Sequence, residues 1–423
     1  MGKQSSNMGE KGSSVPTALS SIRICDFSGI LAGAGATKFL AAFGVDVIRV
    51  EDPIREGRWD VVRGNPPFKD ERRGINLGGG FNNHNVGKRG VTINLKHPKG
   101  LKLAKDLISL SDVVHENFAP GVMDRLGLSY EDMKRCKADI IYVSNSGFGH
   151  SGTYSRFKSF GPIAQAASGL SYTSGINDME PAGWGYSYLD HTGAYYGAMA
   201  ILLAIRHRNR TGEGQYVDIA ASETGAVLHG PAILDHTVNN RTMRQEGRIH
   251  ANRSIWPPRA PHGIYPAAGN DEWVAIACED DQQWEQLAKI IDEPWTKKYS
   301  LLTDRINQQD ELDSALSDWT QSQSKFTIAN QLSNQNIPCA PVRTPRERID
   351  EDPTTKEFGL WPTVHHTEIG STRVDGIPVH LSETDWSMSD GAPCLGEHNH
   401  EVLSEVLKLS PENIADLKKE GAI

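Results

Sequence analysis

Asp190 is the residue whose type and position most directly suggest chemistry. It begins the segment DHTGAYYGAMAILLAIRHRNR, in which residues 193–205 are small or apolar, as in a buried helix. Asp190 is therefore expected at or near the N-terminus of a helix, where the helix dipole and free amide N–H groups favour an ionised carboxylate. An ionised carboxylate in a pocket with little water can attack a reactive acyl group. A plain helix cap is the alternative, because Asp is common at that position.

Other groups on expected loops could bind an anion. Cations or hydrogen-bond donors occur in three stretches, at Gly87-Lys88-Arg89, at Lys96, and at residues 115–121 with Arg125 beyond. Ligands of α/β proteins bind in loops at strand ends. A solvated turn is the alternative for each stretch, and the residues alone do not decide between the two.

The elements that must position these residues begin with a strand, a turn, a helix and a second strand. They are the apolar run 22–27, the glycines 29, 33 and 35, the helical pattern 36–43 and the β-branched run 45–50. This order predicts a βαβ unit in a parallel sheet. It also resembles a dinucleotide fingerprint that ends in an acidic residue, Glu51, but Lys38 occupies the third glycine position. A Rossmann-type turn without nicotinamide is favoured, and an NAD-dependent oxidoreductase remains an alternative.

Strands and helices continue to alternate along the chain, which predicts an α/β fold. Further strands are expected at 112–115, 140–144 and 215–220, with a helix over 99–109. The last third predicts strands at 263–266, 272–278 and 337–344 and helices at 280–291, 310–321 and 326–333. Short helices around 401–407 and 411–419 are expected to close the chain.

Composition excludes several classes of protein. The 423 residues carry a net charge of −9, which disfavours general nucleic-acid binding. The five cysteines are scattered without a CxxC pair, so neither a disulfide framework nor a zinc site is expected, and no histidine cluster has metal-binding spacing. The longest apolar run, near 197–205, is too short to span a membrane. Residues 1–20 are polar and predict a disordered tail, and the myristoylation pattern at Gly2 is weak.

Several motifs in order resemble the class III CoA-transferases, from about Ser21 to the C-terminus. These motifs are DFSGILAGAGATKFLAAFGVDVIRVEDP at 26–53, KRGVTINLKHPKG at 88–100, ENFAPGVMDRLGL at 116–128, SGFG at 146–149, LDHTGAYYGAMAILLAIRHRNRTGEGQYVDI at 189–219, IPCAPVRT at 337–344 and APCLGEHNHEVL at 392–403. Together they are far more specific than a single glycine pattern.

The resemblance implies a fold and a partner. It implies a Rossmann-like large domain with an inserted small α+β domain, and two chains interlinked like rings, either two copies of this chain or this chain with a related subunit. The expected parts are a tail at 1–20, the large domain at 21–230, a linker at 231–262, the small domain at 263–335 and a return to the large domain at 336–423. It further implies a cytoplasmic enzyme without a metal or permanently bound cofactor, whose substrates are coenzyme A (CoA) thioesters and carboxylic acids.

In the family the nucleophilic aspartate opens the motif that Asp190 opens here. The implied reaction runs from an aspartyl–acyl anhydride to an aspartyl–CoA thioester, which the acceptor carboxylate then attacks. The resemblance places the CoA contacts at Ile30, Leu31, Ala32, Ile93, Lys96, Asn117, Phe118, Arg125 and Lys158. The three cations among them suit phosphate groups.

Departures from the family pattern bear on the substrate. Formyl-CoA transferases have glutamine where Leu31 stands, a basic residue at Asp52, and a run of glycines where residues 250–261 are bulky, with Trp256 and Arg259. A larger acceptor than oxalate is therefore expected, such as a carnitine-like acid or an aryl-substituted succinate like benzylsuccinate, with succinyl-CoA as a possible donor.

Two further residue patterns refine this expectation. The essential aspartate of the related racemases falls at Gly161, which disfavours racemisation. Trp184, Tyr186 and Tyr188 could line an aromatic pocket or could simply pack in a core. A non-catalytic subunit of a hetero-oligomer remains a second alternative.

Overall fold

The computed structural model describes residues 17–175, 179–185, 187–242, 252–254 and 257–423. The chain divides into two compact units, which are described separately. Unit 1 comprises Met1–Gly169, Gly185–His229 and Phe358–Ile423, and unit 2 comprises Leu170–Trp184 and Gly230–Glu357. The predicted tail up to residue 16, with its myristoylation pattern, lies outside the described residues, as do Tyr186 and Trp256.

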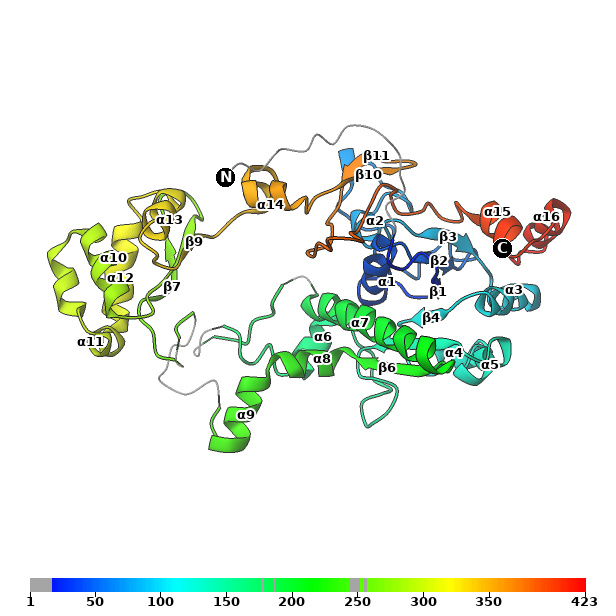
Figure 1. Cartoon of the computed structure of the whole chain (residues 1–423), viewed down its shortest axis with the longest axis horizontal. Helices are drawn as coiled ribbons and strands as arrows, with labels where there is room; N and C mark the ends of the chain where they lie inside the picture. The colour runs from blue at the N-terminus through cyan, green and yellow to red at the C-terminus, as the bar shows by residue number, and fades with distance from the viewer. Residues whose placement is uncertain (1–16, 176–178, 186, 243–251, 255–256) are drawn as a thin grey trace. The chain divides into compact units, whose positions relative to one another are not determined.

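Unit 1 is built on a six-stranded parallel sheet (Figure 1). Its strands are β1 (Arg23–Asp26), β2 (Asp46–Glu51), β3 (Arg89–Thr92), β4 (Val113–Glu116), β5 (Ile141–Ser146) and β6 (Tyr216–Ala220). Their order is β3-β2-β1-β4-β5-β6, and every neighbouring pair is parallel. The predicted α/β class and parallel sheet are confirmed. The chain leaves β1 in one direction and β4 in the other, so a topological switch point lies between them.

Helices cover both faces of this sheet. On one face α1 (Ala32–Ala42) and α7 (Tyr188–Thr211) share a core with strand residues, represented by Leu40, Ile201 and Val143. On the other face lie α3 (Pro98–Ser109), α5 (Tyr130–Cys136) and α16 (Pro411–Lys419), around Leu107, Met133 and Leu417. The remaining helices of unit 1 are α2 (Gly79–His84), α4 (Val122–Arg125), α6 (Gly161–Ala167), α8 (Ala221–Leu228) and α15 (Asn399–Glu401).

The first helix begins earlier than predicted. The pattern predicts a glycine-rich turn through residue 35 and a helix from residue 36, whereas α1 begins at Ala32 and includes Gly33 and Gly35. Packing explains the difference. A β-carbon built on Gly35 would lie 3.0 Å from the β-carbon of Ala194 in α7. The small residues of α1 therefore allow close approach to α7, and this tertiary contact outweighs the low helix propensity of glycine.

Small residues of α7 allow this helix to pack closely against neighbouring elements. A β-carbon on Gly197 would lie 3.3 Å from the β-carbon of Ala36 in α1, and the Asn145 amide of β5 donates 3.1 Å to the carbonyl of Gly193. Gly193 and Gly197 thus allow β5 and α1 to approach α7 closely. The helix ends at Gly212, which is left-handed with a φ of 77°.

The C-terminal segment of unit 1 returns to the sheet. The side chain of Asn399 brackets Thr92 of β3, accepting from its N–H at 2.8 Å and donating to its hydroxyl at 2.7 Å. A hairpin of β10 (Thr363–His366) and β11 (Gly370–Arg373) precedes it in the chain.

Unit 2 is a small α+β body. Its antiparallel sheet has the order β7-β8-β9, with β7 (His262–Pro266), β8 (Trp273–Ala277) and β9 (Cys339–Pro341). Its helices are α9 (Gly230–Asn239), α10 (Asp281–Ile291), α11 (Leu302–Asn307), α12 (Gln309–Thr320), α13 (Lys325–Ser333) and α14 (Pro353–Phe358), the last ending one residue into unit 1. Trp284, Leu316 and Ile328 are core residues from three of these helices.

The bounds of unit 2 differ from the predicted small domain. The predicted linker contains α9, and the segment from 336 to Glu357 belongs to unit 2 because β9 pairs with β8. Among the described residues, no helix is long and apolar enough to cross a membrane.

Candidate active site

Asp190 lies in the first turn of α7, as the third residue of the helix, so the predicted placement is confirmed. Its backbone N–H donates 2.9 Å to the carbonyl of Ser187, which starts the helix. The carboxylate lies against Gly161 at the start of α6: a β-carbon built on Gly161 would be 2.8 Å from Oδ2 and 3.0 Å from Cγ of Asp190. Any side chain at position 161 would displace the Asp190 carboxylate. The glycine therefore leaves room for this carboxylate.

Burial controls the ionisation of this carboxylate. Desolvation raises the pKa of Asp190 from 3.8 to about 6, and a hydrogen bond from the Ser187 hydroxyl opposes part of that rise. With a pKa near 6, roughly nine-tenths of the carboxylates are ionised at pH 7. The group is therefore both poorly hydrated and charged, which is the state that a carboxylate nucleophile needs.

Behind α7 lies a second polar cluster. The rings of His191 and His84 are 5.4 Å apart, and Lys38 donates 2.8 Å to the carboxylate of Asp375. Burial lowers the pKa of His84 to about 4 and also lowers the pKa of His191. Both imidazoles are thus neutral at pH 7, and Lys38, which occupies the third fingerprint position, is committed to Asp375.

The loop after β1 is clamped at the switch point. Asn117, just after β4, accepts from the N–H of Gly29 at 2.8 Å and donates to its carbonyl at 3.0 Å. Glu116 holds the clamp, because its carboxylate accepts from the Phe118 N–H at 2.7 Å. The ring of Phe118 packs 5.0 Å from that of Trp59, and Trp59 also covers Gly29. The Asn117 amide is therefore occupied by the loop and supports it.

The residues predicted to contact CoA are only partly brought together. Ile30, Leu31 and Ala32 form the clamped loop and the start of α1, so they lie beside Asn117 and Phe118. Ile30 is half-buried with a φ of 59°. The side chains of Leu31, Ala32 and Ile93 are buried, which leaves mainly their backbone for a ligand. Ile93 follows β3, two strands away from β1.

The three predicted phosphate cations are exposed. Lys96 follows β3, Arg125 ends α4, and Lys158 lies three residues before Gly161. None of the three forms an ion pair with any residue that the structure describes, so each is available to an anion in solution.

Two other predicted cations are not available. Lys88 is buried and donates 2.9 Å to the carbonyl of Ala34, and Arg89 binds Asp46 and Glu401. The anion-binding interpretation of residues 87–89 is therefore wrong, because strand pairing draws this segment into the sheet. Glu51 is buried as well and accepts two hydrogen bonds from Arg63, so it cannot hold a ribose in a nicotinamide site.

Lys88 and Glu51 belong to a buried ionic network under the β1–α1 loop. Arg49 donates 2.9 Å to the carbonyl of Ser28 and 2.6 Å to Asp60. Asp26 accepts from the N–H and hydroxyl of Ser28. Burial alone would raise the pKa of Asp26, but the nearby cations, Lys88 foremost, hold it well below its usual range. The loop is thus fixed at Ser28 by charged hydrogen bonds.

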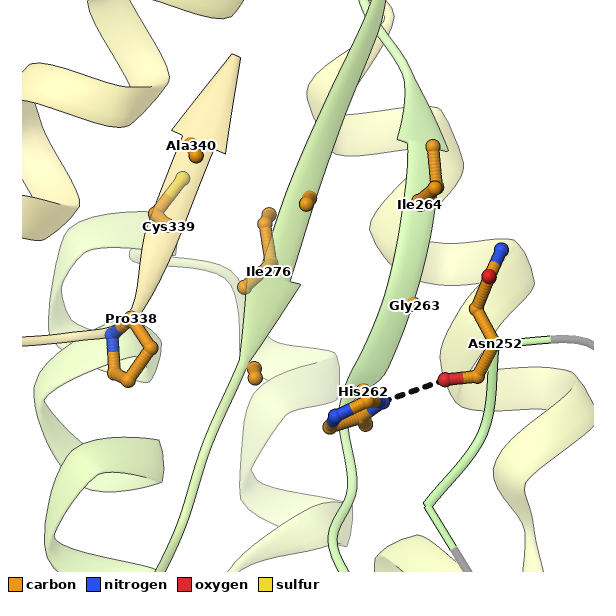
Figure 2. Close-up of a pocket in the computed structure, with 10 residues that line it drawn as sticks. Asn252, His262, Gly263, Ile264, Ile276, Pro338, Cys339 and Ala340 are labelled. Carbon is orange, nitrogen blue, oxygen red and sulfur yellow. Dashed lines mark hydrogen bonds between the residues drawn. The ribbon is translucent and has the colours of Figure 1, made fainter. Parts of the chain in front are cut away.

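A hollow of about 350 Å³ lies in unit 2 on β7, β8 and β9, lined by residues such as His262, Ile276 and Cys339 (Figure 2). His262 Nδ1 is 2.5 Å from the carbonyl of Asn252. Burial raises the pKa of the Cys339 thiol to about 12, so the thiol is unreactive. None of the predicted site residues lines this hollow. Among the described residues, no group of three or more His, Cys, Asp or Glu side chains could hold a metal ion.

Two residues near the site were missed by sequence reasoning. Trp59 carries no local signal, because its role depends on contact with Gly29. Ser187 does carry one: it lies three residues before Asp190, the spacing of a helix capping box. Of the predicted aromatic residues, Trp184 is half exposed and its indole N–H donates to Ser174 in unit 2.

Comparison with known proteins points to one protein family. The model of CoA-transferase family III matches residues 19–399. Formyl-CoA:oxalate CoA-transferase of Afipia carboxidovorans is 32% identical over 96% of this chain and 97% of its own length. The beta subunit of succinyl-CoA–L-malate CoA-transferase of Chloroflexus aurantiacus is 30% identical over 97% and 100%.

Solved structures agree with the sequence relatives. The crystal structure of a CaiB/BaiF family protein of Brucella suis superposes with a TM-score of 0.82 and 26% identity, over 92% of this chain and all of that one. The chain therefore belongs to CoA-transferase family III and is a class III CoA-transferase, which moves CoA between acyl-CoA thioesters and carboxylic acids.

Proposed function

We propose that Asp190 is the nucleophile of this CoA-transferase and that its reaction passes through covalent aspartyl intermediates. The observation that carries the proposal is the half-buried carboxylate of Asp190 in the first turn of α7, with open space at Gly161. A desolvated carboxylate attacks thioesters more readily than a hydrated one, since less water must be removed from it.

The proposed steps conserve the energy of the donor thioester. Asp190 attacks the donor acyl-CoA, which forms an aspartyl–acyl anhydride and releases CoA thiolate. The thiolate attacks the aspartyl carbonyl, which forms an aspartyl–CoA thioester and releases the donor acid. The acceptor carboxylate attacks that thioester, and the returning thiolate then captures the acceptor acyl group and frees Asp190. Holding thiolate and anhydride together supplies the effective concentration that these exchanges require.

We further propose that CoA lies along the carboxyl ends of β1, β3 and β4. The clamped loop at Ile30–Ala32 would meet the pantetheine, with Phe118 covering part of it. Lys96, Arg125 and Lys158 would bind phosphates, which their exposure and lack of ion pairs among the described residues support.

Succinyl-CoA is the proposed donor and a dicarboxylic acid the proposed acceptor. Relatives at 29–32% identity are named for succinyl-CoA with L-malate, mesaconate or D-citramalate. Because residues 250–261 are bulky, we also propose an aryl-substituted succinate such as benzylsuccinate as the acceptor. Of that stretch, Arg259 is described and pairs with Glu279 in unit 2. One relative is named a beta subunit, so a related second subunit is a possible partner.

A trapping experiment tests the nucleophile. The pure chain is incubated with succinyl-CoA and hydroxylamine and then digested for mass spectrometry. We expect a hydroxamate on Asp190 alone, and Asp190→Ala should lower kcat by roughly 10³-fold or more while keeping the fold. Asp106→Asn, on the exposed side of α3, is the control and should keep full activity.

Two outcomes would decide against the proposal. Full activity of Asp190→Ala would refute it. If the chain alone gives no adduct with any donor but gains one with a related subunit, the hetero-oligomer alternative is favoured.

A further inference from the structure

Two helices of unit 1 begin with a serine followed three residues later by an aspartate. The aspartate caps its helix in one of them and not in the other. Ser129 and Asp132 open α5, and Ser187 and Asp190 open α7, so each pair reads Ser-x-x-Asp. This spacing is that of a capping box, in which the serine side chain and the third helical side chain each bind the other residue's backbone N–H.

At α5 the capping box is complete. Ser129 is extended, with φ −63° and ψ 164°, and its hydroxyl oxygen accepts from the Asp132 N–H at 3.2 Å. Asp132 accepts from the N–H of Ser129 at 3.0 Å and from its hydroxyl at 2.6 Å. These hydrogen bonds from Ser129 lower the pKa of Asp132. The carboxylate is fully engaged in starting its helix.

At α7 the same residues do not form this box. Ser187 is left-handed, with φ 43° and ψ 48°, and its side chain makes no capping hydrogen bond within the described part of the chain. The Ser187 side chain still favours the ionised form of Asp190, but burial outweighs it and moves the pKa of this carboxylate in the opposite direction, up to about 6. A left-handed conformation is unfavourable for any residue other than glycine and clusters at functional sites.

The space around Ser187 explains how this conformation persists. A β-carbon on Gly161 would lie 3.1 Å from Cβ of Ser187 and 2.8 Å from Oδ2 of Asp190. Ser187, Asp190 and the bare α-carbon of Gly161 therefore form one tightly packed group between α6 and α7.

We propose that the left-handed turn at Ser187 releases Asp190 from capping its own helix, and that Ser187 is a positioning residue for the nucleophile. Its backbone conformation withdraws the N–H that would occupy the carboxylate. Its hydroxyl keeps one hydrogen bond to the carboxylate, which orients the oxygen beside Gly161 and limits how far burial disfavours the charge. The inference rests on the proposed role of Asp190.

Two variants separate the conformation from the hydroxyl. Ser187→Gly adopts the left-handed turn without strain but has no hydroxyl, so the acid limb of the kcat/KM profile should move up by about one pH unit, with activity kept at high pH. Ser187→Thr is β-branched and an effective cap when extended, so it should restore the capping box. Its acid limb should move down, and its activity should fall about tenfold or more at every pH.

The test is whether the acid limb of the kcat/KM profile moves in opposite directions in Ser187→Gly and Ser187→Thr. A residue with a merely structural role would change activity without moving the limb in two directions. The matched controls are Ser129→Gly and Ser129→Thr at α5, which should leave the limb in place. If both Ser187 variants shift the limb in the same direction, or leave it where it is, the proposal is overturned.

A readout without activity keeps this test independent of the proposed function. The Tm difference between each protein and its Asp190→Asn counterpart, followed from pH 4 to pH 9, reports the titration of Asp190 itself. The midpoint should rise in Ser187→Gly and fall in Ser187→Thr. The other ionisable groups on or against α7 in the described part of the chain, among them His84, His191, Lys38, Asp375 and the Arg208–Asp112 pair, are present in both members of each pair, so their contributions cancel. If the protein is inactive but the titration midpoint of Asp190 shifts as expected, the positioning role of Ser187 is supported even though the proposed catalytic role of Asp190 is not.

Discussion

Burial and charge oppose each other at the carboxylate of Asp190. Burial raises its pKa to about 6, whereas the Ser187 hydroxyl favours the ionised form. The proposed nucleophile is therefore kept ionised at neutral pH at some cost to the stability of the fold, a cost that functional sites commonly carry. Gly161 adds space where any side chain would press on the carboxylate.

The first prediction follows from the sign of this shift. A carboxyl group whose pKa is higher in the folded than in the unfolded state contributes stability at low pH, and that contribution is lost as the pH rises through about 6. Asp190→Asn should therefore raise Tm at pH 8, by an amount equivalent to about 2–3 kcal/mol at most, and should have little effect at pH 4. Differential scanning calorimetry at both values checks it. An equal effect at the two values would show that Asp190 is not desolvated.

At the scale of elements, the β1–α1 loop is the part most strongly held. Arg49 and Asp26 fix it from below at Ser28, and Asn117 fixes it across the switch point at Gly29. Buried charges that are paired and hydrogen-bonded resist rearrangement, since removing one partner leaves the other unpaired in the interior. A rigid loop lowers the entropy cost of binding a long, flexible CoA molecule.

Asn117→Ala should therefore weaken CoA binding. The variant loses both hydrogen bonds to Gly29, worth about 1 kcal/mol each, so KM for the acyl-CoA should rise about tenfold while kcat changes little. Steady-state kinetics with the donor varied at saturating acceptor measures the split. Asn209→Ala on the exposed side of α7 makes the same chemical change and serves as the control. An unchanged KM would show that the hydrogen bonds between Asn117 and Gly29 do not contribute to CoA binding.

At the scale of the whole molecule, α7 is buried on one side and apolar on the other. Tyr195, Met199 and Leu203 follow each other at four-residue spacing and are 45%, 50% and 68% exposed. A continuous exposed apolar stripe on a long helix marks a protein interface. We propose that the interlinked dimer implied by the family resemblance covers this stripe.

We expect a native mass of twice 46.4 kDa, measured by light scattering after size exclusion. Leu203→Glu should lower the dimer fraction, because a charge would be buried without a partner. Leu110→Glu, at a leucine exposed to 47% beyond α3, is the control and should remain dimeric. A monomer in the unaltered chain would contradict the dimer proposal, unless addition of a related subunit restores assembly.

Much of unit 1 could be predicted from local pattern. Apolar runs at β1, β2, β4 and β5 predict buried strands, the segment at β6 predicts a strand, and small residues after Asp190 predict a buried helix. These features depend on residues close in sequence, so periodicity is enough to reveal them. The position of Asp190 in the first turn of a helix could be predicted as well, because an aspartate before a buried helix is a local signal and the family motif surrounds it.

Only the tertiary structure decided how the site is supported. Asn117 clamps a glycine 88 residues away, and Lys88 turns from a predicted ligand into a partner of Asp26 across 62 residues. Gly35 lies in a helix where Ala194 packs against it, and Gly33 lies in the same helix against Ser28 and Asn117. Ser187 and Ser129 share a spacing yet adopt opposite conformations, because α6 packs on one and not on the other. Local spacing carries no information on which distant side chains meet, and those meetings set the conformation and charge on which the chemistry depends.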